Sequence, residues 1–99
     1  MAWSLFYYDE AAQDIIAAKK WYKQQLHGLE KRFAADMKIS IDRILSDPFI
    51  YEIKYKNIRV SYLDIFPYGI HFFVDERKKD IIIVGVFHQH RNPEAYVNR

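Results

Sequence analysis

The stretch that decides the fold is RVSYLDIFPYGIHFFVDERKKDIIIVGVFHQHRNPEAYVNR, residues 59–99. Apolar and polar side chains alternate along residues 58–63 and again along residues 70–75, which is the period of a β-strand. The segment DIFPY predicts a turn between these strands, and DERKKD predicts a polar hairpin tip. The run IIIVGVF is apolar throughout, which is typical of a central strand covered on both faces. Such short connections predict a three-stranded antiparallel meander.

Before this stretch the apolar period is helical. Residues 11–26 predict one helix, which Gly28 ends. A second helix carries a single apolar stripe, made of Leu29, Phe33, Met37, Ile41, Ile44 and Leu45. Asp47 ends it, because a residue that precedes a proline avoids helical backbone. With residues 3–8 as a first strand, residues 1–99 predict a single α+β domain: an N-terminal strand, an antiparallel helical hairpin, and the three-stranded meander.

Composition excludes several classes of protein. The chain has 99 residues, 51% of them hydrophobic, and no cysteine, which excludes a disulfide scaffold and a cysteine-based zinc site. We expect a cytoplasmic protein, because the sequence shows no signal peptide and its longest apolar run is too short to span a bilayer. No phosphate-binding glycine loop is present, so we expect no cofactor. His88 and His90 form a pair without a third metal ligand, so we expect no metal site.

The charge is mildly basic, with a formal net charge of +2. We predict a register that turns one set of side chains towards the helices: Ile58, Val60, Tyr62, Ile70, Phe72 and Val74. The opposite, uncovered face would then collect Arg59, Ser61, His71, Ile82, Val84, Val86 and His88. Lys54 and Lys56 would flank one end of this face, and His90 and Arg91 the other. The prediction is a basic, polar strip on an apolar floor.

Such a strip suits an anionic ligand, with RNA as the first candidate. Cleavage of RNA at its own 2′-hydroxyl needs a base, cations beside the phosphate and an acid, which histidine, arginine and tyrosine can supply. Our candidate catalytic residues are His88, His90, Arg91 and Tyr96, and our candidate RNA- or target-binding residues are Lys54, Lys56, Arg59 and His71. A structural role is the alternative for each: His71 as a core side chain, His88 and His90 as solvated residues, and Arg59 as the partner of an acid.

These residues resemble a known family, the RelE/ParE superfamily of toxins from bacterial type II toxin–antitoxin modules. The resemblance is carried by a strand with an arginine, an FPY turn, an apolar strand ending in histidine, and an R-x-P ending followed by an aromatic residue: here Arg59, Phe66–Tyr68, residues 81–88, Arg91, Pro93 and Tyr96. Two positions depart from the family pattern, because Asn92 stands where aspartate is common and Tyr96 where many members have tryptophan.

The resemblance implies a growth-arresting toxin and an antitoxin partner. ParE-like members poison DNA gyrase without nuclease chemistry, whereas RelE-like members cleave mRNA on the ribosome; a member of low toxicity that only binds its antitoxin is a third alternative. For a nuclease, the resemblance implies roles for Lys54, Lys56, Arg59, Arg91 and Tyr96, with His88 or His90 as alternatives. We expect a partly disordered acidic antitoxin to fold into apolar grooves of the toxin, with Trp3, Trp21 and Tyr22 as candidate contacts.

Overall fold

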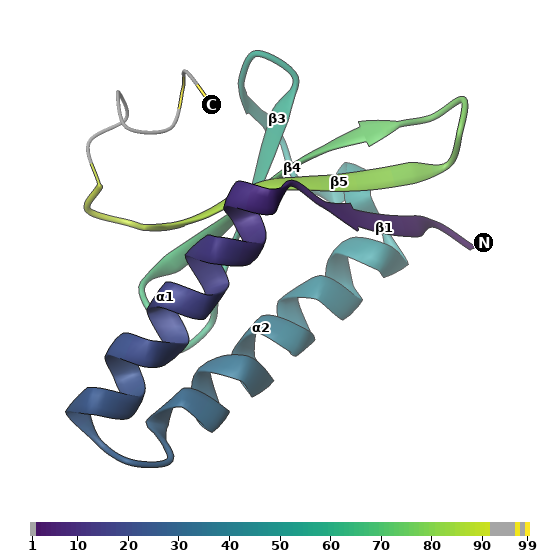
Figure 1. Cartoon of the computed structure of the whole chain (residues 1–99). Coiled ribbons are helices and arrows are strands. Elements are labelled where there is room, and N and C mark those ends of the chain that lie inside the picture. Colours follow the sequence, from purple (N-terminus) through teal and green to yellow (C-terminus); the bar gives the residue numbers. More distant parts are fainter. Residues whose placement is uncertain (1, 92–96, 98) are drawn as a thin grey trace.

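The computed structural model describes residues 2–91, 97 and 99. A first strand and two helices are followed by a short 3₁₀ helix and four strands (Figure 1): β1 Ser4–Tyr7, α1 Asp9–Gln25, α2 Leu29–Ser46, η1 Pro48–Ile50, β2 Ile53–Tyr55, β3 Ile58–Tyr62, β4 Tyr68–Asp75 and β5 Asp80–His88. The helices lie side by side against one face of the sheet. Within the described residues, no helix has the length and apolar character needed to cross a membrane.

The predicted helical hairpin is confirmed. Gly28 has a φ of 98°, a backbone conformation that side chains disfavour, and this allows the sharp turn between α1 and α2. Its N–H donates to Glu30 Oε1 at 2.8 Å, which secures the start of α2. The apolar stripe of α2 packs in the core as predicted, with Phe33 and Ile44 fully buried. The period of the sequence therefore identified both helices and the buried face of α2.

The sheet is mixed rather than purely antiparallel. Its strand order is β1-β5-β4-β3-β2, and β3, β4 and β5 form the predicted antiparallel meander. β1 pairs with β5 in parallel, and the long connection between them contains the helical hairpin and then β2, β3 and β4. The short β2 extends the opposite edge of the sheet and was not predicted. β5 thus lies between two strands, as its continuous apolar run indicated.

The predicted register is wrong by one residue in β3. Arg59 faces Phe72 and Ser61 faces Ile70, and residues that face each other across two strands share a side of the sheet. Since Ile70 and Phe72 belong to the core beneath the helices, Arg59 and Ser61 lie on the helix side.

Val60 instead faces His71, on the side away from the helices. The pairing of β4 with β5 shifts register between His71 and Phe72. Ile70 therefore pairs with Val86, and Tyr68 pairs with His88. As a result, Val86 and His88 also lie on the helix side. Of the polar residues predicted to share one uncovered face, only His71 lies on that side.

The face away from the helices is itself buried along the strands. Ile58, Val60 and Val84 are each 6% exposed, and Phe87 is 2% exposed. The Phe87 ring lies edge-on to the His71 imidazole, with 4.8 Å between the ring centroids. The sheet therefore has apolar packing on both sides, which leaves no room for the predicted solvated strip.

Gly85 is the residue that makes room for the Phe87 ring. A Cβ at Gly85 would come within 2.3 Å of Phe87 Cζ, and the buried ring cannot easily move away from His71. We expect Gly85→Ala to destabilise the fold by about 2 kcal/mol, the typical effect of overpacking a core. Urea titration would measure it, and the same substitution in a Phe87→Leu background is the control. An equal loss in both backgrounds would contradict this explanation, because the ring would then not be the obstacle.

Candidate functional site

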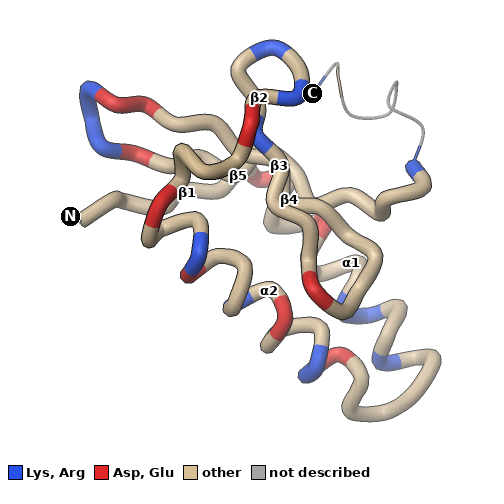
Figure 2. The backbone as a smooth tube through the Cα atoms, turned by 180° about the vertical axis from the view of Figure 1, so that it is seen from behind, with Lys and Arg blue, Asp and Glu red and all other residues tan. Residues whose placement is uncertain are grey.

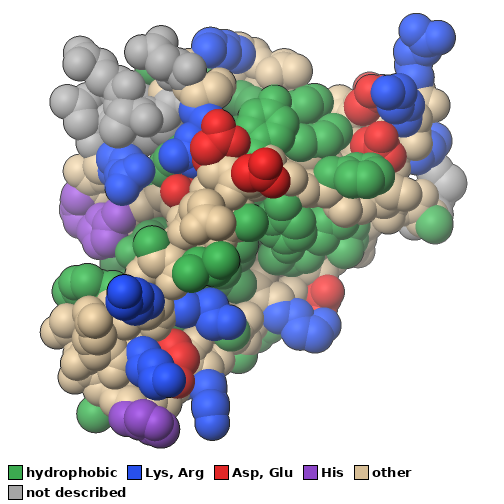
Figure 3. All heavy atoms as spheres, in the orientation of Figure 1, with side chains coloured by type: hydrophobic (Ala, Val, Ile, Leu, Met, Phe, Trp, Pro, Cys, Tyr) green, Lys and Arg blue, Asp and Glu red, His purple; other side chains and the backbone are tan. Residues whose placement is uncertain are grey.

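A groove of about 560 Å³ lies between α1 and the end of the β4–β5 ladder. We call it the α1–β5 groove, and its lining residues are Asp14, Ala17, Ala18, Trp21, Tyr22, Pro67, Tyr68, Val86, His88 and Arg91. Histidine side chains gather beside a basic side chain where β5 ends (Figure 3). The groove thus combines an apolar floor with polar groups at one end, which is the usual composition of a binding site.

His88, His90 and Arg91 are brought together at this end of the groove. The His88 ring is 5.3 Å from the Tyr68 ring and 5.3 Å from the His90 ring, measured between centroids. The backbone N–H of His90 donates to His88 Nδ1 at 3.1 Å, which assigns the proton of neutral His88 to Nε2. The Arg91 guanidinium lies 5.5 Å from the centroid of the Phe87 ring. Three of the four predicted catalytic residues therefore cluster, while Tyr96 lies outside the described residues.

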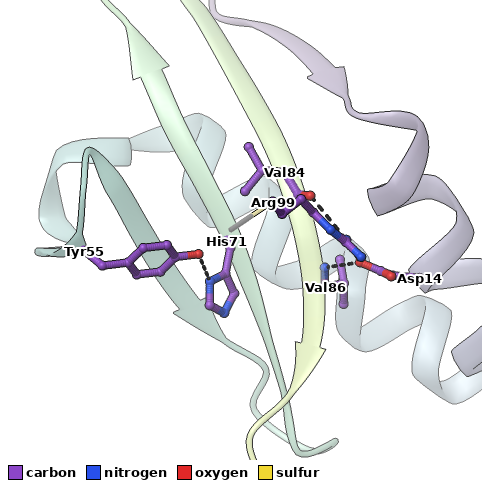
Figure 4. Close-up of polar contacts among 6 residues, drawn as sticks. All are labelled: Asp14, Tyr55, His71, Val84, Val86 and Arg99. Carbon is purple, nitrogen blue, oxygen red and sulfur yellow. Dashed lines mark hydrogen bonds and ion pairs between the residues drawn. The ribbon is translucent and has the colours of Figure 1, made fainter. Parts of the chain in front are cut away.

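Asp14 is a residue of the groove that the sequence analysis missed. Its Oδ2 accepts the backbone N–H of Val86 at 3.0 Å and lies 2.5 Å from Arg99 Nη1 (Figure 4). The Val86 N–H needs this partner because β1 ends at Tyr7 and leaves the edge of β5 unpaired beyond it. Asp14 lies on the same side of α1 as the buried Ala11 and Ala18. The sequence could have indicated it as an aspartate at a position where the helical period predicts an apolar side chain.

His71 sits on the other face of the sheet, away from the groove. It is 5% exposed, and its Nδ1 lies 2.8 Å from the Tyr55 hydroxyl (Figure 4). Burial, together with the nearby charge of Arg99, lowers the pKa of His71 to about 4, while Asp14 opposes the shift. His71 is therefore neutral near physiological pH and is unsuited to holding a phosphate as a cation.

Figure 2 shows Lys and Arg distributed along the backbone, interspersed with Asp and Glu. Three of the predicted basic residues belong to the β2–β3 hairpin, and each of them contacts a different group. Lys54 forms an exposed ion pair with Glu52 at 2.7 Å, and Lys56 Nζ donates to the carbonyl of Val97. Arg59 Nη1 donates to the Tyr51 carbonyl at 2.5 Å, and its guanidinium lies 5.2 Å from the Phe49 ring centroid. Each of these three cations therefore has a different partner. In the part of the chain that the structure describes, no group of three histidine or acidic side chains could hold a metal ion.

Comparison with known proteins gives a consistent result. Residues 5–93 match the family model described as the ParE toxin of the type II toxin–antitoxin system parDE. The fold is similar to a chain of the chromosomal ParDE system from P. aeruginosa, with a TM-score of 0.76 and 18% identity over 88% of this chain and 96% of that one.

Two further structures are more distant. The intact E. coli RelBE toxin–antitoxin complex gives a TM-score of 0.60 and 14% identity over 91% of this chain and 100% of that one. The RelBE2 complex from Mycobacterium tuberculosis gives 0.62 and 12% identity over 92% and 95%. At such identities these structures establish the fold alone. A search of curated protein sequences finds no match.

Proposed function

The chain belongs to the family of ParE toxins of type II toxin–antitoxin systems, and on that premise we propose that it stops bacterial growth by binding DNA gyrase. In this proposal the chain is a binding protein without nuclease chemistry, and a cognate antitoxin holds it inactive. Its place of action would be the cytoplasm, where gyrase works. The similar ParDE and RelBE structures come from toxin–antitoxin systems, which supports an antitoxin partner for this chain as well.

One observation carries the choice of a binding function over RNA cleavage: the residues suited to cleaving RNA are on different parts of the molecule. His88, His90 and Arg91 are at the α1–β5 groove, whereas His71 is buried on the opposite face of the sheet. Arg59 is on the helix side of β3, with its guanidinium against Tyr51 and Phe49. General acid–base catalysis needs the acid, the base and the cation within hydrogen-bonding reach of one substrate. Side chains on opposite faces of the sheet are poorly placed to meet that requirement.

Induced expression in bacteria tests this proposal. We expect growth to stop, plasmid DNA to lose negative supercoiling, and co-expression of the antitoxin to restore both. Primer extension on cellular mRNA should show no new cuts at the ribosomal A site. Growth that stops with A-site cuts and unchanged supercoiling would contradict gyrase as the target, and unimpaired growth would identify a member of low toxicity.

A second candidate function, ribosome-dependent cleavage of mRNA, is favoured by the cluster of His88, His90 and Arg91. A histidine with an assigned tautomer beside a second histidine and an arginine could in principle supply an acid, a base and a cation. If cuts occur, they should disappear in His88→Ala and Arg91→Ala proteins. Cuts that persist in both variants would exclude the cluster as the catalytic site.

A further inference from the structure

The sheet ends at β2, whose outer edge has no strand partner among the described residues. β2 is the last strand in the order of the sheet, and it pairs only with β3. The β2–β3 hairpin projects away from both helices (Figure 1). Tyr51, just before β2, continues the extended backbone with a φ of −91° and a ψ of 129°. An edge strand turns alternate N–H and C=O groups outwards, and these groups are a template for pairing with another chain.

The side chains of this edge carry opposite charges two residues apart. Glu52 and Lys54 lie on the same side of the strand, where Glu52 Oε1 and Lys54 Nζ are 2.7 Å apart in an exposed ion pair. Ile53 lies between them and faces Arg59 of β3, so it points to the helix side of the sheet. We call residues 52–54, with their outward backbone groups, the β2 edge.

The order of these charges makes the β2 edge complementary to a second copy of itself. When two identical strands pair antiparallel about a two-fold axis at Ile53, Glu52 of each copy faces Lys54 of the other. Opposite charges in facing positions stabilise a pair of strands, and like charges destabilise it. An axis at Glu52 or at Lys54 would instead place two glutamates or two lysines opposite each other, and so would parallel pairing in register. Among these pairings, the charges therefore favour the axis at Ile53.

An apolar cluster lies beside the β2 edge on the helix side. Ile53 is 51% exposed, and Ile50 and Phe49 of the preceding η1 are 67% and 44% exposed. Phe49 and Ile53 both lie next to Arg59, whose guanidinium carbon is 5.2 Å from the centroid of the Phe49 ring. A two-fold axis at Ile53 brings the two isoleucines together and removes apolar surface from water. The two-fold contact therefore combines a charged side with an apolar side.

We propose that the β2 edge is a dimer interface, at which two copies of the chain pair their β2 strands antiparallel about a two-fold axis at Ile53. The two five-stranded sheets then become one continuous sheet. This arrangement gives Lys54 a role as a contact between copies. Among the described residues, none of β2 lines the α1–β5 groove, so that groove stays open on both copies. The inference goes beyond the proposed function and does not depend on gyrase as the target.

The dimer should be weak, because only a short run of backbone pairs and the buried area falls at the low end for protein interfaces. We expect a dissociation constant of about 10–100 μM. Analytical ultracentrifugation of the purified chain from about 5 to 500 μM would show the shift from monomer to dimer. The dimer should weaken as the salt concentration rises, because the facing charges are exposed and screened. A chain that stays monomeric up to about 500 μM would overturn the inference.

Charge reversal at the β2 edge is the sharpest test. Glu52→Lys and Lys54→Glu each place like charges opposite each other, and we expect each to raise the dissociation constant about 30-fold. An equimolar mixture of the two variants should form a heterodimer with the affinity of the wild type, since every lysine of one variant then faces a glutamate of the other. Lys38→Glu is the matched control, because Lys38 forms the same kind of exposed ion pair with Asp42 on α2. It should dimerise as the wild type does.

Rescue by mixing separates the interface from damage to the fold, because two misfolded variants would not restore each other. If the single variants dimerise as tightly as the wild type, or if their mixture stays monomeric, the copies do not meet at the β2 edge and the inference is overturned. Hydrogen exchange locates the contact, since the amides of residues 52–54 should become better protected as the wild-type concentration rises.

A different partner at the β2 edge would also be recognised. Protection of residues 52–54 that appears only when gyrase or a neutralising antitoxin is added, with the chain itself monomeric, would assign the edge to that partner and overturn the dimer. None of these results bears on whether gyrase is the target, which the supercoiling assay tests.

Discussion

An Asp36→Ala variant is expected to be less stable than the wild type by about 3–4 kcal/mol, because it leaves two backbone donors without an acceptor. Asp36 is 2% exposed on α2, and its Oδ2 accepts the N–H groups of Ile65 at 3.0 Å and Phe66 at 2.9 Å. These bonds fix the turn between β3 and β4 against α2. Urea unfolding followed by circular dichroism would measure the loss.

Two variants control this prediction. Asp42→Ala removes an acid from the same helix that makes only an exposed pair with Lys38, so it should cost no more than about 0.5 kcal/mol. Asp36→Asn keeps an acceptor for the turn and should lie in between, at about 1–2 kcal/mol. If Asp36→Ala were as stable as Asp42→Ala, the carboxylate would not be what holds the turn.

The second large effect is a loss of stability in acid that originates at His71. The pKa of His71 is lowered to about 4 in the folded protein, against about 6.5 for an unfolded histidine, so the unfolded chain binds the proton more strongly. The stabilisation is complete above about pH 6.5 and is lost progressively as the pH falls towards about 4. The expected contribution is a decrease of about 2 kcal/mol between near pH 7.5 and near pH 5.

The comparison that isolates this effect is His71→Phe, which keeps a ring against Phe87 but cannot titrate. The difference in unfolding free energy between wild type and variant should change by about 2 kcal/mol over that pH range. A difference between wild type and His71→Phe that is constant with pH would show that His71 titrates normally in the fold.

The helices and the meander could be predicted because each rests on a local pattern. The stripe of α2 runs from Leu29 to Leu45 with one buried side, and that pattern has no strand alternative. The parallel position of β1 could not be predicted in this way. The residues of β1 pair with Asp80–Ile83, more than seventy positions further along, and nothing local to β1 identifies the partner strand or its direction.

The register of β3 was predicted wrongly for a different physical reason. Alternation identifies the buried face only where the other face is solvated, and in β3 and β4 both faces are packed. Ile58 and Val60 are buried as their apolar character suggests, but beside His71 rather than beneath the helices. Arg59 is tolerated on the helix side because its guanidinium reaches the Tyr51 carbonyl and the Phe49 ring.

The sequence could predict only those residues of the candidate site that are neighbours along the chain. His88, His90 and Arg91 are neighbours in the sequence, so their proximity followed directly. Asp14, Trp21 and Tyr68 join them only because α1 packs beside the end of β5, and that is a tertiary contact. The functional roles predicted for Lys54, Lys56, Arg59, His71 and Tyr96 stay predictions.

The most direct measurement is a supercoiling assay with purified bacterial gyrase, relaxed plasmid and the purified chain. We predict that the chain blocks supercoiling in proportion to its concentration, and that equimolar antitoxin restores it. If gyrase keeps its full activity at chain concentrations well above its own, while the same preparation stops growth in cells, the proposal that this toxin acts on gyrase is contradicted.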